Sequence, residues 1–442
     1  MSDSVLWKQE TAKAVENFGP GRLPRQLIRA YGEVKQAALG AAQRYKPELW
    51  PEETALAISA ACTAVIRGDH DEDFPLSLSQ GGAGTSIHLN INEVISSIVE
   101  RSNGYCLDPL EDLARFQSTN DTFATAVNIA LLRGLRELEK LVIHLQEKLV
   151  LLETEYDSVL MTGRTEMQDA LPFGLGQLFG SWAGMIERDR WRLSKLAERI
   201  REVPLGGTAI GTCFNAPRNY MNDALQSLRS LTGLPLARSQ NLPDAVAHKD
   251  SLAELASGYA LAAGNLLKIT GDLLYYSSSP VAEFRHPELQ WGSSIMPVKV
   301  NPVLLEFVQG LALRVDGEGR TAGIYARESR LQLNAMLPFL AESLFRQEED
   351  LSAALKALCR FFDEVDIDTV RMEANLAASP ALLNALLPKL GYHRLKPLIN
   401  EFSARPPRDL EEFRNRAAEV LSLNPALLDR WLSPEELIGQ SF

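Results

Sequence analysis

The stretch GSSIMPVKVNP at residues 292–302 gathers small residues, two hydroxyls, one lysine and one amide in a chain otherwise rich in leucine and alanine. Its glycine and serines predict a loop, and Pro302 suits the first turn of a helix that follows. Lys299 and Asn301 would then lie at a helix N-terminus, where backbone N–H groups and the helix dipole favour an anion. The stretch therefore predicts a carboxylate site. A connecting loop without chemistry is the alternative.

The stretch SQGGAGTSIHLNINEV at residues 79–94 also places short polar side chains next to glycines. Glycines allow close approach to the backbone, and Thr85, Ser86, His88 and Asn90 supply the polar groups. The stretch resembles a phosphate loop only loosely, because no Gly-Lys-Ser/Thr follows the glycines. A tight turn before an amphipathic helix is the alternative to a binding role.

The stretch FQSTND at residues 116–121 is typical of the start of a helix. Read as structure, it is an N-cap before a long helical segment. Ser118, Thr119 and Asn120 are at the same time three adjacent hydrogen-bond donors at a helix end that favours an anion. Both interpretations stay open at this point.

A fourth polar stretch, GRTEMQDALPFGLGQ at residues 163–177, gathers charged and amide groups before Pro172. Thr165 and Glu166 are the members considered for a site. The alternative is a charged loop that an internal pair between Arg164 and Asp169 holds in shape, in which case Arg164 need not touch a substrate.

The segments that must position these groups are predicted to be helices. No proline occurs between Pro109 and Pro172, and apolar residues in that segment recur at spacings of three and four. One such row consists of Leu131, Leu135, Leu138, Val142, Leu145, Leu149 and Leu152. A helix from Asp121 to about Tyr156 is too long to bury its apolar face alone, so it belongs in a bundle or an oligomer. β-branched clusters and Asn-Gly or Asp-Gly turns are scarce, which argues against strands and predicts an all-α fold.

Three domains are expected from the same pattern: residues 1–112 with shorter helices, residues 113–364 with a central bundle of about five long helices, and residues 365–442 as a small helical tail. The segment YALAAGNLLKITGDLL at residues 259–274 is apolar around most of a helix. Such a helix is usually central to a bundle or shared between subunits.

Composition narrows the function classes. The chain has 442 residues, 45% of them hydrophobic, and a net charge of −12, which argues against nucleic acid or an anionic membrane as a partner. Its four cysteines form no CxxC pair, so neither a zinc nor a redox motif is predicted. No signal peptide and no run of 18 apolar residues is visible, and a cytoplasmic protein is expected.

Together, the polar stretches occur in the order of a known family. GAGTSIHLNINEV, FQSTND, GRTEMQDALP, LGGTAIGT from Leu205 and GSSIMPVKVNP resemble the blocks of the fumarase/aspartase superfamily, within the branch of class II fumarases and aspartate ammonia-lyases. AVENFG near the start is similar to the aspartase pattern, and the resemblance covers roughly residues 7–340. It implies an all-α protein whose homotetramer has a twenty-helix core, with each site shared between three chains. It also implies a small dicarboxylate or amino-acid substrate and no cofactor or catalytic metal.

The resemblance assigns roles by position. Ser293, the first serine of Gly-Ser-Ser, matches the family's general base, and Lys299 and Asn301 match groups that stabilise a doubly charged aci-carboxylate intermediate. Positions that hold the substrate's carboxylates and leaving group match Thr85, Ser118, Thr119, Asn120 and Thr165. Ser86, His88 and Glu306 complete the expected substrate-binding set.

Departures from the family pattern bear on the substrate. Glu166 stands where fumarases usually have His and aspartases His or Gln, and that His pairs in fumarases with a glutamate that matches Glu306. Two carboxylates there would repel unless one is protonated or a cation lies between them. A substrate ammonium would relieve the repulsion, which favours cleavage of a C–N bond of aspartate or an N-substituted aspartate to give fumarate. His88 also replaces a common Asn, and Cys213 replaces a common Gly.

Two other functions stay open. One is malate–fumarate hydration, which a His in place of Glu166 would have supported. The other is a catalytically silent scaffold on the same fold, against which the presence of Ser293, Lys299 and Asn301 speaks. Glu166 could also turn away from the site and pair with Arg164 or another basic residue.

Overall fold

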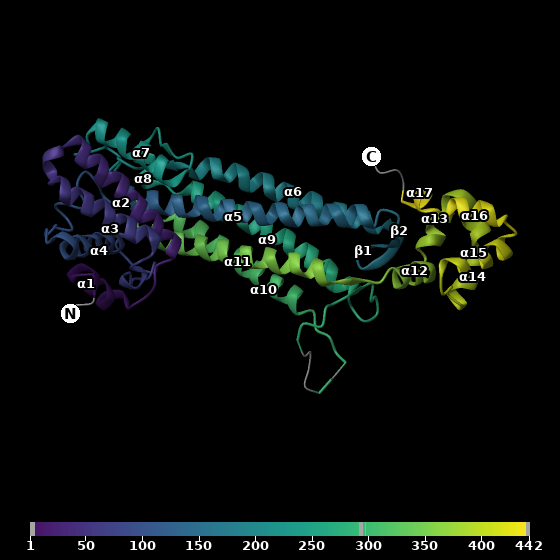
Figure 1. Cartoon of the computed structure of the whole chain (residues 1–442). Coiled ribbons are helices and arrows are strands. Elements are labelled where there is room, and N and C mark those ends of the chain that lie inside the picture. Colours follow the sequence, from purple (N-terminus) through teal and green to yellow (C-terminus); the bar gives the residue numbers. More distant parts are fainter. Residues whose placement is uncertain (1–4, 291–294, 297, 439–442) are drawn as a thin grey trace. The chain divides into compact units, whose positions relative to one another are not determined.

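Helices dominate the computed structural model, which describes residues 5–290, 295–296 and 298–438 (Figure 1). This confirms the predicted all-α class. The chain forms two compact units, one of residues 1–140, 191–263 and 313–352, the other of residues 141–190, 264–312 and 353–442. We call them the first and the second unit. None of the helices in the described ranges is long and apolar enough to cross a membrane.

Five long helices contribute residues to both units. They are α5 (Thr119–Glu155), α6 (Leu175–Ile200), α9 (Asp250–Tyr276), α10 (Val303–Arg327) and α11 (Leu337–Glu364). Helix α5 matches the helix predicted from Asp121 to about Tyr156 within two residues at either end. Six of the seven members of the predicted apolar row, from Leu131 to Leu149, are at most 1% exposed, and the seventh, Leu152, is half-buried near the end of α5. The division into three domains stays a prediction.

The first unit also holds the shorter helices near the N-terminus. They are α1 (Gln9–Phe18), α2 (Arg25–Tyr45), α3 (Glu52–Arg67), α4 (Thr85–Asn103), α7 (Arg218–Thr232) and α8 (Leu242–Ala247), with single 3-10 turns at Pro47–Leu49 and Asp71–Asp73. Helix α2 packs against α3 and α7, and α3 packs against α4. The close approach of α2 and α3 depends on Gly32, because a Cβ atom there would lie 2.9 Å from Cγ1 of Ile66. These helices fix the directions of α4 and α5, whose N-termini carry two of the polar stretches.

Strands are short and few in the described residues, but one hairpin differs from the sequence prediction. Strands β1 (Leu160–Thr165) and β2 (Gln168–Gly174) pair antiparallel where a charged loop was the structural alternative. The remaining strands are two-residue pairs: β3 (Glu202–Val203) with β4 (Ala237–Arg238), and β5 (Phe284–Arg285) with β6 (Asp366–Ile367). The hairpin escaped prediction because its turn is Glu166–Met167 and lacks the glycine or asparagine typical of such turns.

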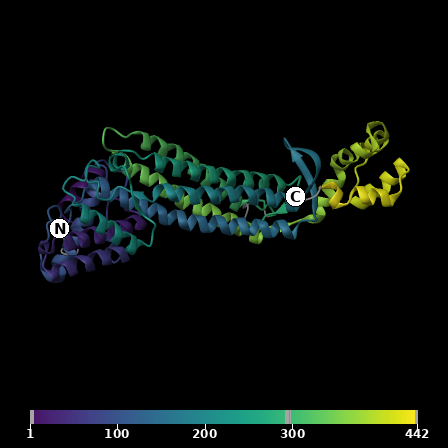
Figure 2. The same cartoon turned by 90° about the horizontal axis from the view of Figure 1, so that it is seen from above.

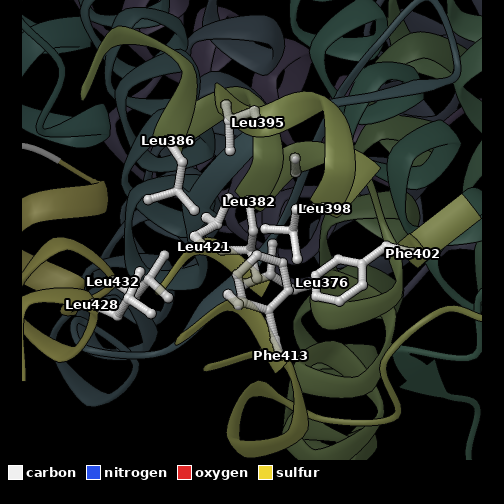
Figure 3. Packing of buried hydrophobic residues seen from close by; sticks show 12 residues of the cluster. Leu376, Leu382, Leu386, Leu395, Leu398, Phe402, Phe413, Leu421, Leu428 and Leu432 are labelled. Atoms are coloured by element: carbon white, nitrogen blue, oxygen red, sulfur yellow. The ribbon is translucent and has the colours of Figure 1, made fainter. Parts of the chain in front are cut away.

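The second unit ends in a group of short helices, drawn in yellow in Figure 2. They are α12 (Thr369–Ala378), α13 (Ala381–Leu390), α14 (Tyr392–Ala404), α15 (Leu410–Leu421), α16 (Pro425–Trp431) and α17 (Pro434–Leu437). Leucine and phenylalanine side chains of these helices close around a core of their own, as Figure 3 shows. In it the rings of Phe402 and Phe413 lie 5.0 Å apart, centre to centre. Helices α12 and α13 also pack against β1 and β2, and Asn384 donates a hydrogen bond to the Ala170 carbonyl (2.9 Å). The hairpin is thereby supported along its length.

Candidate active site

The N-terminus of α5 is built as the sequence predicted for a helix cap. The Ser118 hydroxyl oxygen accepts a hydrogen bond from the Asn120 backbone N–H (3.3 Å), and the Ser118 N–H donates to the Asp121 carboxylate (3.0 Å). This reciprocal arrangement is a capping box with aspartate in the third helical position. It orients Ser118, Thr119 and Asn120 at the positive end of a 37-residue helix.

Asp121 joins this helix end to the loop that carries the block LGGTAIGT. Its second carboxylate oxygen accepts hydrogen bonds from the backbone N–H groups of Gly206 (3.0 Å) and Thr208 (3.1 Å). Burial raises the pKa of Asp121 to about 6, although these N–H donors and Lys35 oppose the rise. The Asn120 amide donates to the Ala209 carbonyl (2.7 Å). Two blocks separated by more than eighty residues therefore form one polar surface.

The N-terminus of α4 carries Thr85 and Ser86 in its first turn. Gly84 precedes them with φ of 92°, and a Cβ atom there would lie 2.7 Å from the ring of Phe123. Both the left-handed backbone and the close approach to α5 require glycine. Thr85 is exposed and Ser86 half-buried, and neither hydroxyl forms a hydrogen bond within the described ranges of the chain. Both hydroxyls are thus available to a bound ligand.

His88 connects the two helix ends. Its ring is 3% exposed; Nδ1 lies 2.9 Å from the hydroxyl oxygen of Thr119 and Nε2 lies 2.6 Å from Nζ of Lys35. Tyr31 stacks on the ring with 5.7 Å between centres. Burial, and then the charge of Lys35, hold the pKa of His88 well below its usual value, so the imidazole is neutral. His88 therefore contacts a predicted substrate-binding residue and is itself enclosed by protein.

Lys35 is a residue of this site that the sequence analysis did not select. It is 0% exposed, and burial lowers its pKa to about 7, although the negative charge of Asp121 opposes this. The sequence could have indicated Lys35, because it follows Tyr31 by four residues on a helix face that is otherwise buried and apolar.

The second unit presents Thr165 and Glu166 at the tip of the β1–β2 hairpin. Both turn residues have positive φ, 51° at Glu166 and 62° at Met167, as a type I′ hairpin turn requires. For residues other than glycine and asparagine this conformation is strained, and such strain concentrates at functional sites. The Glu166 side chain is exposed and forms neither an ion pair nor a hydrogen bond with any residue that the structure describes. The alternative in which Glu166 pairs with Arg164 is not what this structure shows.

Arg164 holds the base of this turn. It makes the predicted pair with Asp169 (Nε to Oδ1, 3.1 Å) and a bidentate pair with Glu283 at 3.0 and 2.8 Å. Its guanidinium also lies 5.5 Å from the ring centre of Tyr275. Burial disfavours the charge on Arg164, but the hydrogen bonds and charge of Glu283 and the charge of Asp169 outweigh it, and the pKa of Arg164 is raised. Arg164 is thus structural.

The stretch 292–302 is described only in part, and Ser293 lies outside the described residues. Lys299 is exposed and Asn301 half-buried, directly before α10, as predicted for a helix N-terminus. The Glu306 N–H donates to the Pro302 carbonyl (3.0 Å), so Pro302 directly precedes the first helical residue, Val303. The Glu306 side chain is exposed in the first turn of α10.

The predicted site residues thus fall into two groups. The structure brings together Ser118, Thr119, Asn120 and His88 in the first unit, beside the first turn of α4 with Thr85 and Ser86. Thr165, Glu166, Lys299, Asn301 and Glu306 belong to the second unit. Cys213 has φ of 57°, which accounts physically for the glycine that the family commonly has there. In the ranges that the structure describes, no three His, Cys, Asp or Glu side chains are placed to hold a metal ion.

Comparison with known proteins agrees with the family resemblance of the polar stretches. A family model described as lyase matches residues 2–317. A class II fumarate hydratase of Xylella fastidiosa is 34% identical over 98% of this chain and 92% of that enzyme. The chain belongs to the fumarase/aspartase superfamily. An aspartate ammonia-lyase of Pseudomonas aeruginosa is 37% identical to this superfamily lyase, over 87% of this chain and 84% of that enzyme.

Solved structures of two fumarate lyases resemble the fold of this chain. A fumarate lyase:delta crystallin from Brucella melitensis, bound to cobalt, has a TM-score of 0.91 and 33% identity, and covers 100% of this chain and 97% of that chain. A class II fumarase from Schistosoma mansoni has a TM-score of 0.88 and 26% identity, over 99% of this chain and 96% of that chain. The lyase fold is therefore shared over essentially the whole length.

Proposed function

We propose that this lyase cleaves the C–N bond of aspartate or an N-substituted aspartate and releases fumarate. The observation that carries the proposal is the exposed carboxylate of Glu166 at the hairpin tip, which forms no ion pair with the described residues. By the family resemblance, this position is usually His in fumarases and His or Gln in aspartases. A carboxylate at the edge of the site attracts a substrate ammonium and repels a third carboxylate or a hydroxyl-bearing dianion. Arg164, the nearest cation in sequence, is held by Asp169 and Glu283 and forms no ion pair with Glu166.

The reaction we infer is an anti β-elimination. Ser293, as its alkoxide, takes a proton from the carbon next to one substrate carboxylate and becomes a neutral hydroxyl, and the electron pair of that C–H bond moves into the carboxylate to give the aci-carboxylate. Lys299, Asn301 and the helix N-terminal donors stabilise the two negative charges. Collapse of this intermediate forms the carbon–carbon double bond and breaks the C–N bond, whose electron pair leaves with nitrogen as neutral ammonia or amine. Thr85, Ser118, Thr119 and Asn120 hold the carboxylates in place.

Hydration of fumarate to malate is the second candidate, and the curated relatives favour it, because several that match 98% of this chain are named class II fumarate hydratases. A substrate screen separates the candidates. Fumarate absorbs in the ultraviolet, so its appearance can be followed from aspartate, an N-substituted aspartate and malate in parallel. We expect fumarate from an amine substrate. Turnover of malate alone would reject the C–N lyase, and no turnover of any succinyl compound would favour a silent scaffold.

Substitution of Glu166 should change the substrate ranking. A like charge next to a substrate carboxylate in a desolvated site costs several kcal/mol of binding free energy. Glu166→Gln and Glu166→His remove the Glu166 carboxylate, so both are expected to raise kcat/KM for malate relative to aspartate. Met167→Leu, the neighbouring turn position, is a control that changes the turn without altering charge. If both Glu166 variants keep the ranking of the parent enzyme, Glu166 is structural and the preference for an amine loses its main support.

We also propose a homotetramer whose sites are shared between subunits. Large apolar side chains on α9 and α10 are exposed in the first unit: Leu261 is 56%, Leu313 61% and Ile324 53% exposed. Exposed apolar side chains on long helices fit burial against other subunits. Analytical ultracentrifugation is expected to show a tetramer. A stable monomer with full activity would contradict shared sites.

A further inference from the structure

Three side chains in the first unit form a continuous row of short contacts. Nζ of Lys35 lies 2.6 Å from Nε2 of His88, and Nδ1 of His88 lies 2.9 Å from the hydroxyl oxygen of Thr119. Nζ of Lys35 also lies 2.9 Å from the Leu113 carbonyl oxygen and 2.8 Å from Oε1 of Gln117. The row therefore runs from a buried lysine to the helix end that is proposed to hold a substrate carboxylate.

The hydrogen-bond directions in this row follow from counting donors. The Leu113 carbonyl can only accept, and Oε1 of Gln117 faces Lys35 because its Nε2 donates to the Arg115 carbonyl (3.2 Å). A charged ammonium has three protons, so its third proton points to His88 Nε2. Neutral His88 then carries its own proton on Nδ1 and donates it to the Thr119 oxygen.

With Lys35 charged, the hydrogen of the Thr119 hydroxyl is left to point away from His88, where it can be donated to a carboxylate. With Lys35 neutral, its two N–H protons are donated to Leu113 and Gln117, and its lone pair accepts a hydrogen bond from the N–H at Nε2 of His88. Nδ1 then carries no proton and accepts a hydrogen bond from the Thr119 hydroxyl. Thr119 presents only lone pairs to the site in that state, and these repel a carboxylate.

We propose that Lys35 and His88 are positioning residues that set whether the Thr119 hydroxyl donates or accepts, and thereby couple carboxylate binding to the proton on Lys35. The proposal rests on the proposed function only in that Thr119 contacts a substrate carboxylate. It assigns His88, where the family commonly has asparagine, a property that asparagine lacks: an imidazole exchanges its donor and acceptor nitrogens, whereas an amide keeps them fixed.

The groups around Lys35 set the pH at which it loses its proton and the Thr119 hydroxyl changes from donor to acceptor, and this pH is near neutral. Lys35 is faced by Cys62 from α3, whose thiol is neutral because burial raises its pKa to about 12, by His88 from α4 and by Asp121 from α5. Burial lowers the pKa of Lys35 to about 7, although the negative charge of Asp121 opposes this. A lysine with a lowered pKa is charged below that value and neutral above it. The donating form of Thr119 is therefore present below about pH 7 and is lost as the pH rises. A bound dicarboxylate favours the charged lysine and extends the donating form to higher pH.

The tautomer can be observed without any turnover. Nitrogen-15 NMR of the histidine-labelled protein distinguishes a protonated Nδ1 from a protonated Nε2, with the His88 resonance assigned from the spectrum of His88→Asn. We expect the proton on Nδ1 at about pH 6 and on Nε2 at about pH 9. One tautomer across this range, or a charged imidazole at about pH 6, would overturn the proposal.

Binding of succinate measured by calorimetry tests the functional consequence, because this dicarboxylate has no group that titrates at neutral or alkaline pH. A hydrogen bond to a charged group corresponds to about tenfold or more in affinity, so Kd is expected to rise by about tenfold between about pH 6.5 and pH 9. His88→Asn should keep the affinity seen at low pH and lose most of this rise. Lys35→Met should bind weakly at every pH.

Lys249→Met is the matched control. Lys249 is a second buried lysine of the first unit, with a pKa lowered by burial to about 8, and its ammonium donates to the Val246 carbonyl (3.1 Å). This variant should keep the pH dependence of the parent. An unchanged pH dependence in His88→Asn, or no binding of succinate at any pH, would contradict the proposal. If aspartate is not turned over but succinate binding shows the expected pH dependence, only the C–N lyase proposal is rejected.

Discussion

Ser293→Ala is expected to lower kcat by about 10²–10⁴-fold, the usual contribution of a general base. A serine removes a carbon-bound proton only when its alkoxide is stabilised by donors in a site without bulk water, so no neighbouring group can easily replace it. Steady-state fumarate formation measures the effect. Sedimentation of the same sample should show the oligomer of the parent protein, because removing one hydroxyl from a stretch that the sequence predicts as a loop should change folding little.

Ser294→Ala is the matched control at the neighbouring position in the sequence and should have a much smaller effect on kcat. Lys299→Met should lower kcat/KM more than kcat, since the lysine is proposed to bind the substrate and also to stabilise the intermediate. Parent-like turnover by Ser293→Ala would show that the base is another residue.

Glu283→Ala is expected to lower the free energy of unfolding by about 3–5 kcal/mol, because it leaves the guanidinium of Arg164 buried without its main partner. Glu283 is 0% exposed and also accepts a hydrogen bond from the Asn375 amide (2.9 Å), so three separate segments depend on it. Urea unfolding at one fixed protein concentration measures the change. The hairpin tip with Thr165 and Glu166 should lose its conformation, and activity should fall with it.

The double variant Arg164→Met with Glu283→Leu should recover part of this stability, since removing both charges leaves neither one unpaired. Glu198→Ala, which breaks an exposed pair with Lys195 (3.1 Å), is the control and should change stability by about 0–1 kcal/mol. If Glu283→Ala changed the free energy of unfolding as little as this control does, solvent would have to reach the Arg164 guanidinium.

The helices and their termini could be predicted because they depend on local patterns. The buried row from Leu131 to Leu149 follows from its spacing, and the start of α5 follows from Ser118 and Asp121, which cap it within three residues. The pair of Arg164 with Asp169 was predictable for the same reason. Each of these interactions joins residues that are close in the sequence.

Other parts of the site join distant segments, and no local pattern encodes them. Glu283 lies 119 residues from Arg164, and Lys35 lies 53 residues from His88. His88 was expected to touch substrate, and only the packing of Tyr31 and Lys35 around it shows that its ring is enclosed. The hairpin was missed because Glu166 and Met167 adopt positive φ against their own preferences, which requires the surrounding contacts of β1 and β2.

A competition in the reverse direction tests the proposed chemistry most directly. The enzyme is incubated with fumarate and ammonium in heavy water, and proton NMR quantifies aspartate and malate in the same tube. Water is present at far higher concentration than the ammonia in equilibrium with ammonium, so addition of ammonia exceeds addition of water only if the site binds and positions nitrogen in preference to water. The account predicts aspartate carrying one deuterium at C3, with little malate. Deuterated malate without aspartate would contradict it and identify the enzyme as a hydratase.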